Sequence, residues 1–239
     1  MQKLLRSAAC SAAALIVLCP PVFADGHQAE VSGDVSGDEA TEALLVRFDD
    51  TRLQQVFVKP GIDLSRYSKM LIQPAGFDYK DVPEVRNPDR RSTSRTAYPL
   101  TESQRREFES SVDKVFSKEF LKSKHFVEVA EPGPDVLLVR GALSDIVSYV
   151  PPERATRDTV LLSVIGQATL LLELRDSESQ ELLASAADRR SVEPNRVSIN
   201  VNSRPINKAQ TERVLKRWAQ ILVRGLDELH ENGPLEPAE

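Results

Sequence analysis

The sequence predicts a single α+β domain, in which a mixed or antiparallel β-sheet of about five to six strands is packed by two amphipathic helices. Two stretches repeat apolar residues with a helical period. Short β-prone runs lie around them, bounded by Pro, Gly and acidic turn residues. Because both helical faces need an apolar surface to pack against, we expect one sheet to carry both helices.

The composition is that of a globular chain. Of 239 residues, 41% are apolar and 28% are charged, and there are 10 Gly, 15 Pro and 2 Cys. These values exclude a collagen-like, a wholly disordered and a disulfide-rich protein.

Residues 1–24 have the pattern of a secretory signal peptide. Basic residues precede an apolar segment, residues 8–18, that is too short to cross a bilayer as a helix. Val22 and Ala24 place small residues three and one positions before the expected cleavage between Ala24 and Asp25. We therefore expect a bacterial periplasmic protein.

Cys19 offers an alternative, lipid anchoring to the outer membrane, because it ends the apolar segment. Bacterial lipid attachment requires a small residue before the cysteine, and Leu18 is bulky. Cys10 follows small residues but comes too early for a full apolar segment. Soluble export is the expectation, and the mature chain would then lack cysteine, which excludes disulfides, thiolate metal sites and cysteine nucleophiles.

Residues 25–43 form an expected flexible acidic leader with few apolar side chains. Residues 25–50 contain eight acidic residues against Arg47, whereas residues 51–239 contain 28 basic and 28 acidic residues. A folded part with balanced charge argues against a nucleic-acid partner.

The domain is expected over residues 44–231. Val56–Val58 and Met70–Ile72 are short β-prone runs that predict strands, and residues 78–100, with three prolines, predict a long loop. Thr101 and Gln104 have the spacing of a capping box, so a helix should follow. Its apolar face contains Phe108, Val112, Val115, Phe116 and Phe120.

Further strands are expected at Phe126–Val129 and Val136–Val150, the second with an irregularity near Ser144. Residues 168–174 and 181–192 are β-prone runs joined by a polar turn, which predicts a hairpin.

A final helix is expected to begin at an Asn207 cap. Asn232, Gly233 and a following Pro form its stop signal, and residues 232–239 are an expected disordered tail. Trp218, the only tryptophan, is expected to anchor this helix against the sheet.

The runs Val160–Ile165 and Leu170–Leu172 are apolar at consecutive positions. A strand with apolar residues on both faces needs cover on both, which predicts a homodimer or a partner protein. The alternative is that Val160–Ile165 folds back over the sheet within one chain.

Several stretches together resemble the domain-of-unknown-function 3313 family of bacterial envelope proteins. They are Val56–Gly61 with Asp63–Tyr67, Pro132–Leu137, Glu173–Asp176, Leu182–Ala184, Asp188–Arg190 and Trp218–Ala219. The resemblance spans about residues 44–230. It implies an exported protein with one α/β domain and many lipoprotein relatives, and it carries no catalytic residues with it.

No motif predicts chemistry. His27, His125 and His230 are scattered along the chain, and no zinc-protease, nucleophile-elbow or phosphate-loop motif occurs. We therefore expect no metal, no cofactor, no catalytic residues and no enzymatic activity.

Basic residues concentrate between Ala186 and Gly225, a segment that contains nine basic and three acidic residues. The candidate patch for an anionic partner, such as a lipid headgroup or the acidic leader, comprises Arg189, Arg190, Arg196, Arg204, Arg213 and Arg217. The alternatives are a solvated helix face with a basic loop, and an ion pair of the Asp188–Arg190 segment with Asp135 or Asp145.

The expected function is that of a non-enzymatic periplasmic accessory or interaction domain that docks on an envelope protein or on a second copy. The alternative is a module that binds a small ligand or a lipid in a groove beside residues 78–100.

Overall fold

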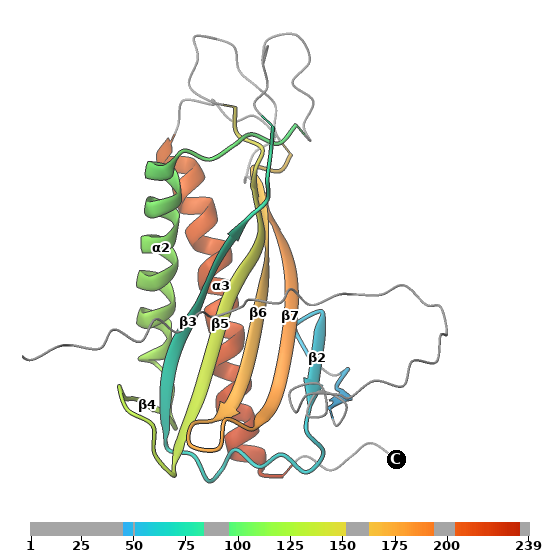
Figure 1. Ribbon diagram of the computed structural model, residues 1–239, viewed down its shortest axis with the longest axis vertical. Coiled ribbons are helices and arrows are strands. Elements are labelled where there is room, and N and C mark those ends of the chain that lie inside the picture. The colour runs from blue at the N-terminus through green and yellow to red at the C-terminus, as the bar shows by residue number, and fades with distance from the viewer. Residues whose placement is uncertain (1–44, 50, 84–95, 152–162, 194–203, 235–239) are drawn as a thin grey trace, which may run out of the picture. The chain divides into compact units, whose positions relative to one another are not determined.

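The computed structural model describes residues 45–49, 51–83, 96–151, 163–193 and 204–234, except the side chains of 204–207 (Figure 1). All of them belong to one compact unit, Ser36–Glu239. The expected signal peptide with its Ala24–Asp25 cleavage site, Cys19, the whole leader and Arg196 lie outside the described residues.

A mixed sheet of seven strands forms one layer of the domain. Its spatial order is β1-β2-β7-β6-β5-β3-β4, and all neighbours are antiparallel except β3, which is parallel to both β5 and β4. The strands are β1 (Val46–Arg47), β2 (Gln55–Val58), β3 (Lys69–Tyr79), β4 (Val127–Glu128), β5 (Val136–Ser148), β6 (Gly166–Asp176) and β7 (Leu182–Val192).

The expected mixed α+β sheet is confirmed, but five to six strands was too few. The strand missing from the prediction is β1, whose two residues pair with the end of β2 through Val46 and Val58. A two-residue strand has no detectable alternation of its own, because only its partner defines it.

Strand β3 is longer than the sequence pattern predicted. It continues through Pro74 and Gly76, and its pairing with β5 shifts register at this point. Gly76 has φ of +115°, which L side chains rarely adopt. Pro74 and Gly76 thus mark an irregularity inside β3 and do not end the strand. The strand continues to Tyr79, past residue 78 where the loop was expected to begin.

The irregularity expected in β5 is confirmed. The register with β6 shifts between Ser144 and Val147, and Asp145 has a positive φ of 51°. The β6–β7 hairpin is also confirmed as an antiparallel pair joined by a polar turn.

Helix α2 (Glu102–Phe120) begins with the predicted capping box of Thr101 and Gln104. Helix α3 (Arg204–Asn232) begins before Asn207, so the predicted cap at Asn207 is wrong. Pro205 falls in the first turn, where proline is tolerated because no helical hydrogen bond requires its nitrogen. The helix ends at the predicted place, with Gly233 at φ +69°.

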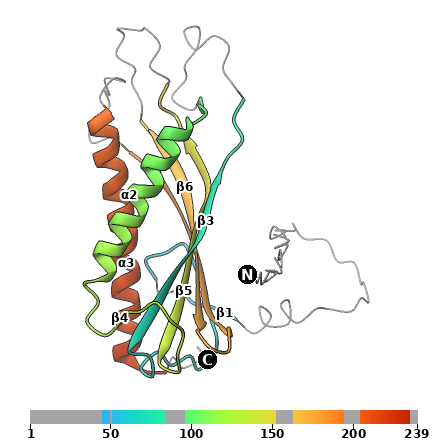
Figure 2. The same cartoon turned by 60° about the vertical axis from the view of Figure 1, so that its left-hand side comes forward.

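Both helices cover the same face of the sheet (Figure 2). Leu170, Leu172 and Leu174 alternate along β6 and are buried in the core that includes the helices. Trp218 of α3 is 1% exposed, as expected of an anchor. The lone tryptophan therefore reports on the packing of α3.

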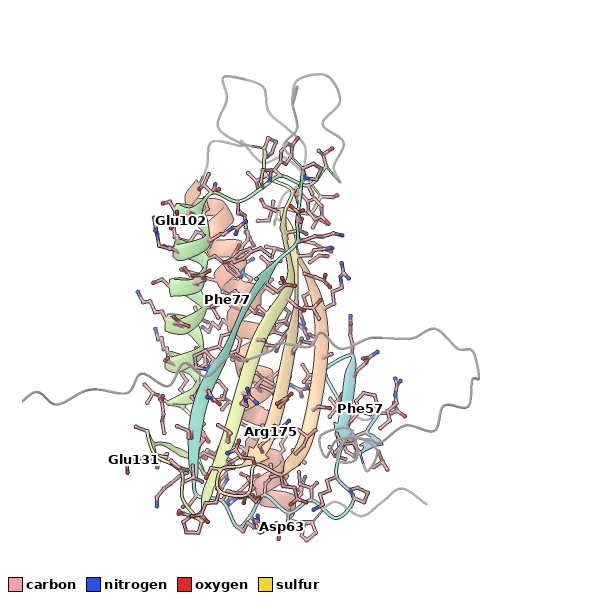
Figure 3. All side chains as sticks on the ribbon, viewed as in Figure 1. Phe57, Asp63, Phe77, Glu102, Glu131 and Arg175 are labelled. Carbon is pink, nitrogen blue, oxygen red and sulfur yellow. The ribbon has the colours of Figure 1, made fainter. Side chains whose placement is uncertain are left out.

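No described helix covers the second face of the sheet, whose side chains are drawn in Figure 3 with Arg175 labelled. Leu171 points to this face and is partly exposed, whereas Leu170 and Leu172 point to the helices. Half of the run Val160–Ile165, residues 160–162, lies outside the described residues, whereas Ile165 is buried in a small cluster with Val150 and Val192. No described helix is long and apolar enough to cross a membrane.

Candidate functional site: a basic pocket beside α3

Six cationic side chains from three segments meet at one open pocket of about 530 Å³. They are Arg52, Arg190, Arg213, Lys216, Arg217 and Arg224. Gln220 and Ile221 complete the lining. The segment before β2 supplies one of the cations, β7 supplies another, and α3 supplies the remaining four. We refer to this site as the basic pocket.

Helix α3 presents its four cations to the pocket because they share one face. Arg217 follows Arg213 by four residues and Arg224 follows Arg217 by seven, which are about one and two turns of an α-helix. The opposite face carries the buried residues Leu215, Trp218 and Leu222. Packing of that apolar face against the sheet therefore orients the cationic face.

Asp188 of β7 holds the three segments of the pocket together. This carboxylate is 2% exposed and accepts hydrogen bonds from Trp218 Nε1 at 2.6 Å, Arg190 Nε at 2.5 Å and the backbone nitrogen of Gln54 at 3.1 Å. A buried carboxylate is tolerated when several donors satisfy it. Its donors lie on α3, on β7 and before β2, so Asp188 fixes the relative positions of the three walls.

Arg190 is held in place from two sides. Its Nε donates to Asp188, and its Nη2 donates to the carbonyl oxygen of Arg52 at 3.3 Å. The side chain is 21% exposed. Since side chains alternate along a strand, Arg190 lies on the same face of β7 as Asp188, toward the helices. Its guanidinium is thus partly ordered before any ligand arrives.

Most of the positive charge in the pocket is uncompensated. Within the described ranges, no ion pair involves Arg52, Lys216, Arg217 or Arg224. Arg213 donates to the side-chain oxygen of Gln210 at 3.0 Å. Like charges that face one another repel, and a bound anion would relieve that repulsion.

Glu119 of α2 lies next to the pocket without neutralising it. Its burial acts to raise the pKa of the carboxyl, but hydrogen bonds from Lys122 and from Gln220 outweigh that effect and lower the pKa. Lys122 and Gln220 thus hold the Glu119 carboxylate, whose negative charge also attracts Lys216 of the pocket.

The structure brings together three of the six predicted patch residues: Arg190, Arg213 and Arg217. Arg189 is excluded from the pocket, because it points to the opposite face of β7, where its Nη1 lies 3.8 Å from Asp145. The side chain of Arg204 is outside the described part, as is Arg196. The Arg189–Asp145 contact confirms the predicted ion pair of this segment with Asp145, whereas the Arg190–Asp188 pair within the segment was not predicted.

Sequence reasoning missed three of the pocket cations. Lys216 and Arg224 belong to the basic segment between Ala186 and Gly225 and share the helical face of Arg213 and Arg217. Their three-, four- and seven-residue spacing along the predicted helix is the signal that could have identified them. Arg52 gives no such signal, because only the pairing of β2 with β7 brings it to the pocket.

A second polar cluster lies where the β2–β3 connection meets the β6–β7 turn. Asp176 accepts hydrogen bonds from Arg66, Tyr67 and Ser179. Burial acts to raise the pKa of Asp176, but the hydrogen bonds from Ser179 and Tyr67 outweigh it and lower the pKa to about 2. These contacts close a turn of the backbone, and we assign the cluster a structural role.

His125 and His230, far apart in sequence, stack at 4.3 Å between ring centroids. Glu231 lies 2.9 Å from His125 Nε2. Among the described residues, no group of three potential metal ligands occurs. The pair joins the α2–β4 connection to the end of α3.

Residues 44–222 match the model of a family described as a protein of unknown function, DUF3313. No curated protein matches the sequence.

Among solved structures, one similar protein is XCC0632 from Xanthomonas campestris, assigned to family DUF330. It is 12% identical over 72% of this chain and 89% of its own, with a TM-score of 0.38. A hemagglutinin homologue from Helicobacter pylori is 13% identical over 77% and 92% of the two chains, with a TM-score of 0.37. The PelC dodecamer from Paraburkholderia phytofirmans is 11% identical over 70% and 95%, with a TM-score of 0.33. TM-scores this low carry no conclusion about function.

Proposed function

The chain belongs to the DUF3313 family, and from that premise we propose that it is an exported, non-enzymatic interaction domain that binds an anionic partner in the basic pocket. The signal-peptide pattern expected at residues 1–24 supports a proposed periplasmic location in the bacterial envelope.

One observation carries this proposal: four cations line the pocket without an ion pair to any described acid. They are Arg52, Lys216, Arg217 and Arg224. The whole chain has a formal net charge of −5, so this concentration of positive charge is local. A local positive site on an acidic protein gives selectivity for an anionic partner over other surfaces.

The character of the pocket supports binding in preference to catalysis. Five of its six cations are arginines, which remain protonated at any physiological pH and exchange no protons. Such groups attract, orient and neutralise an anion without acting as acid or base.

The proposal is tested by retention of the purified protein on a heparin resin, a sulfated polyanion. An acidic protein should not bind such a resin unless a basic site engages it. We expect the wild-type protein to be retained at low salt. The double variant Arg217→Glu/Arg224→Glu should flow through, because it reverses two charges of the pocket face.

The matched control is Lys80→Glu/Lys114→Glu, which makes the same change in net charge at two exposed residues outside the pocket. It should elute with the wild type. Equal retention of the pocket variant and the wild type would contradict the proposal.

A small-ligand module is the second candidate, because about 530 Å³ falls within the range of small-molecule sites. The described pocket is strongly basic and not mostly apolar, and none of its lining residues comes from 78–100. A ligand of this module would thus also be an anion, and it would bind in a different place from the groove expected beside that loop.

The identity of a protein partner is also a proposal. An envelope protein is the expected partner, and a second copy of the chain is the alternative. The homodimer predicted from Leu170–Leu172 has its partly exposed Leu171 on the face that no described helix covers. Sedimentation equilibrium on the wild type and on Leu171→Glu tests it, and a monomeric wild type would contradict it. Anchoring through Cys19 stays the alternative to soluble export.

A further inference from the structure

We propose that the ligand of the basic pocket carries two phosphoryl groups, and that the arginines of α3 and Arg190 bind them. This inference rests on the proposed function, since it names the class of anion that the same pocket receives. The shared chemistry is that of a diphosphate or bisphosphate group, either free in solution or in the headgroup of a lipid.

The number of uncompensated charges favours multiply charged groups. Arg52, Arg217 and Arg224 supply three positive charges with no described carboxylate partner, and Lys216 adds a fourth that the nearby carboxylate of Glu119 offsets in part. A phosphoryl monoester carries about −1.5 to −2 at neutral pH, so two such groups balance four cations. A single carboxylate would leave three of the four charges facing one another.

The donors of the pocket also match phosphoryl oxygens. The guanidinium group presents a planar fork that binds two oxygens of one phosphoryl group at once. Lysine offers only a point charge, and it supplies one cation of the six. Each phosphoryl group has three acceptor oxygens and can engage more than one arginine, which a carboxylate does less well.

Arg190 provides a fixed receptor within this set. Its Nε is engaged by Asp188 and its Nη2 by the carbonyl of Arg52, while no described hydrogen bond uses its Nη1. The buried Asp188 therefore orients the guanidinium before binding, which lowers the entropic cost of capturing an anion. Asp188 is a positioning residue, because it acts on the ligand only through the orientation of Arg190.

The length of the cationic face of α3 favours a ligand with more than one anionic group. Arg217 and Arg224 are seven residues apart on α3, which corresponds to about 10 Å along the helix axis. A ligand with two phosphoryl groups can engage both ends of that face without requiring the side chains of Arg217 and Arg224 to converge on one point. Ile221 lies between them and is partly exposed, so a linker between two phosphoryl groups would pass over an apolar side chain.

Isothermal titration calorimetry on the full mature chain tests the inference with three soluble probes: tripolyphosphate, orthophosphate and citrate. Citrate carries three carboxylates and tests whether a multiply charged anion without phosphoryl groups binds equally well. We expect tripolyphosphate to bind at least tenfold more tightly than citrate or orthophosphate. Arg217→Gln and Arg224→Gln should each weaken tripolyphosphate binding at least tenfold, and the control Lys114→Gln should leave it unchanged.

A vesicle arm distinguishes the two sources of the phosphoryl groups. The probes are phosphatidylcholine vesicles with and without phosphatidic acid, whose headgroup is a phosphate monoester. Binding that requires phosphatidic acid and that tripolyphosphate displaces supports a lipid source. Tight tripolyphosphate binding without vesicle binding supports a soluble ligand.

The failures are separable. If citrate binds as tightly as tripolyphosphate and both depend on Arg217, the phosphoryl preference is overturned while the anion-binding function stands. If no probe binds and heparin retention is also insensitive to Arg217→Glu/Arg224→Glu, both the inference and the proposed function are overturned.

Discussion

Asp188 shows how one residue connects the core of this protein to its candidate site. It is buried, yet it lies two residues before the pocket arginine Arg190 on the same face of β7, and it accepts a hydrogen bond from the tryptophan that anchors α3. The sequence predicted that Trp218 would be buried, because it falls in the apolar stripe of the helix. Its polar partner was not predictable, since the two residues belong to different elements that only the packed structure brings together.

Removal of the Asp188 carboxylate should therefore destabilise the domain. In Asp188→Ala, the indole nitrogen of Trp218 and the Nε of Arg190 lose their acceptor in a buried setting. We expect a loss of about 3 kcal/mol in the free energy of unfolding. Urea denaturation followed by Trp218 fluorescence measures this loss.

The control for that variant is Asp113→Ala, which removes an exposed carboxylate of α2. It should change the stability by less than about 0.5 kcal/mol. An equal effect of the two substitutions would show that Asp188 does not hold the walls of the pocket together.

Asp176 should make the stability depend on pH at the acid end. Its pKa of about 2 in the folded protein lies below the ordinary value of 3.8, so the unfolded chain takes up the proton first as pH falls. The stabilisation is complete above about pH 5 and is lost progressively toward pH 2. The shift corresponds to about 2 kcal/mol.

In Asp176→Asn this part of the pH dependence should be absent. Urea denaturation at a series of pH values between 2 and 6 measures the free energy of unfolding of this variant against the wild type. A shift of ~1 pKa unit corresponds to about 1.4 kcal/mol in that free energy. Glu178→Gln, an exposed acid in the same turn, is the control and should keep the wild-type profile. A wild-type profile in Asp176→Asn would contradict the structural role given to this cluster.

At the scale of elements, periodicity predicted which face of each helix is apolar but not how deeply each residue is buried. Phe116 and Phe120 lie on the same predicted stripe of α2, yet Phe120 is 3% exposed whereas Phe116 is only partly buried. The difference arises because α2 packs against α3 as well as the sheet, as the hydrogen bond from Gln220 to Glu119 shows. Depth of burial depends on these tertiary neighbours, which a single helix pattern does not encode.

Phe120→Asp should consequently be more damaging than Phe116→Asp. The first substitution places a carboxylate in the closed core and should cost more than about 4 kcal/mol, enough to unfold most domains. The second leaves the carboxylate partly hydrated and should cost less. Thermal denaturation monitored by circular dichroism ranks the two variants. A less stable Phe116→Asp would contradict the deeper burial of Phe120 than of Phe116 in the structure.

At the scale of the whole molecule, the sequence predicted a mixed sheet with two helices, but not the order of its strands. The hairpin β6–β7 was visible because its strands are neighbours in sequence. The pairing of β2 with β7 joins residues more than a hundred positions apart, and no local pattern encodes it. That pairing brings Arg52 to the cations of α3, so the pocket is a property of the assembled fold and its full set of residues required the structure.

The central claim is that this assembled pocket receives an anion. The most direct measurement is an NMR titration of the arginine Nε–Hε resonances with a small sulfated heparin oligosaccharide. We predict that the signals of Arg190, Arg217 and Arg224 shift together and saturate. Arg175 and Arg189, on the opposite face of the sheet, should not shift. Shifts that are as large at Arg175 and Arg189 as at the pocket arginines would contradict the account.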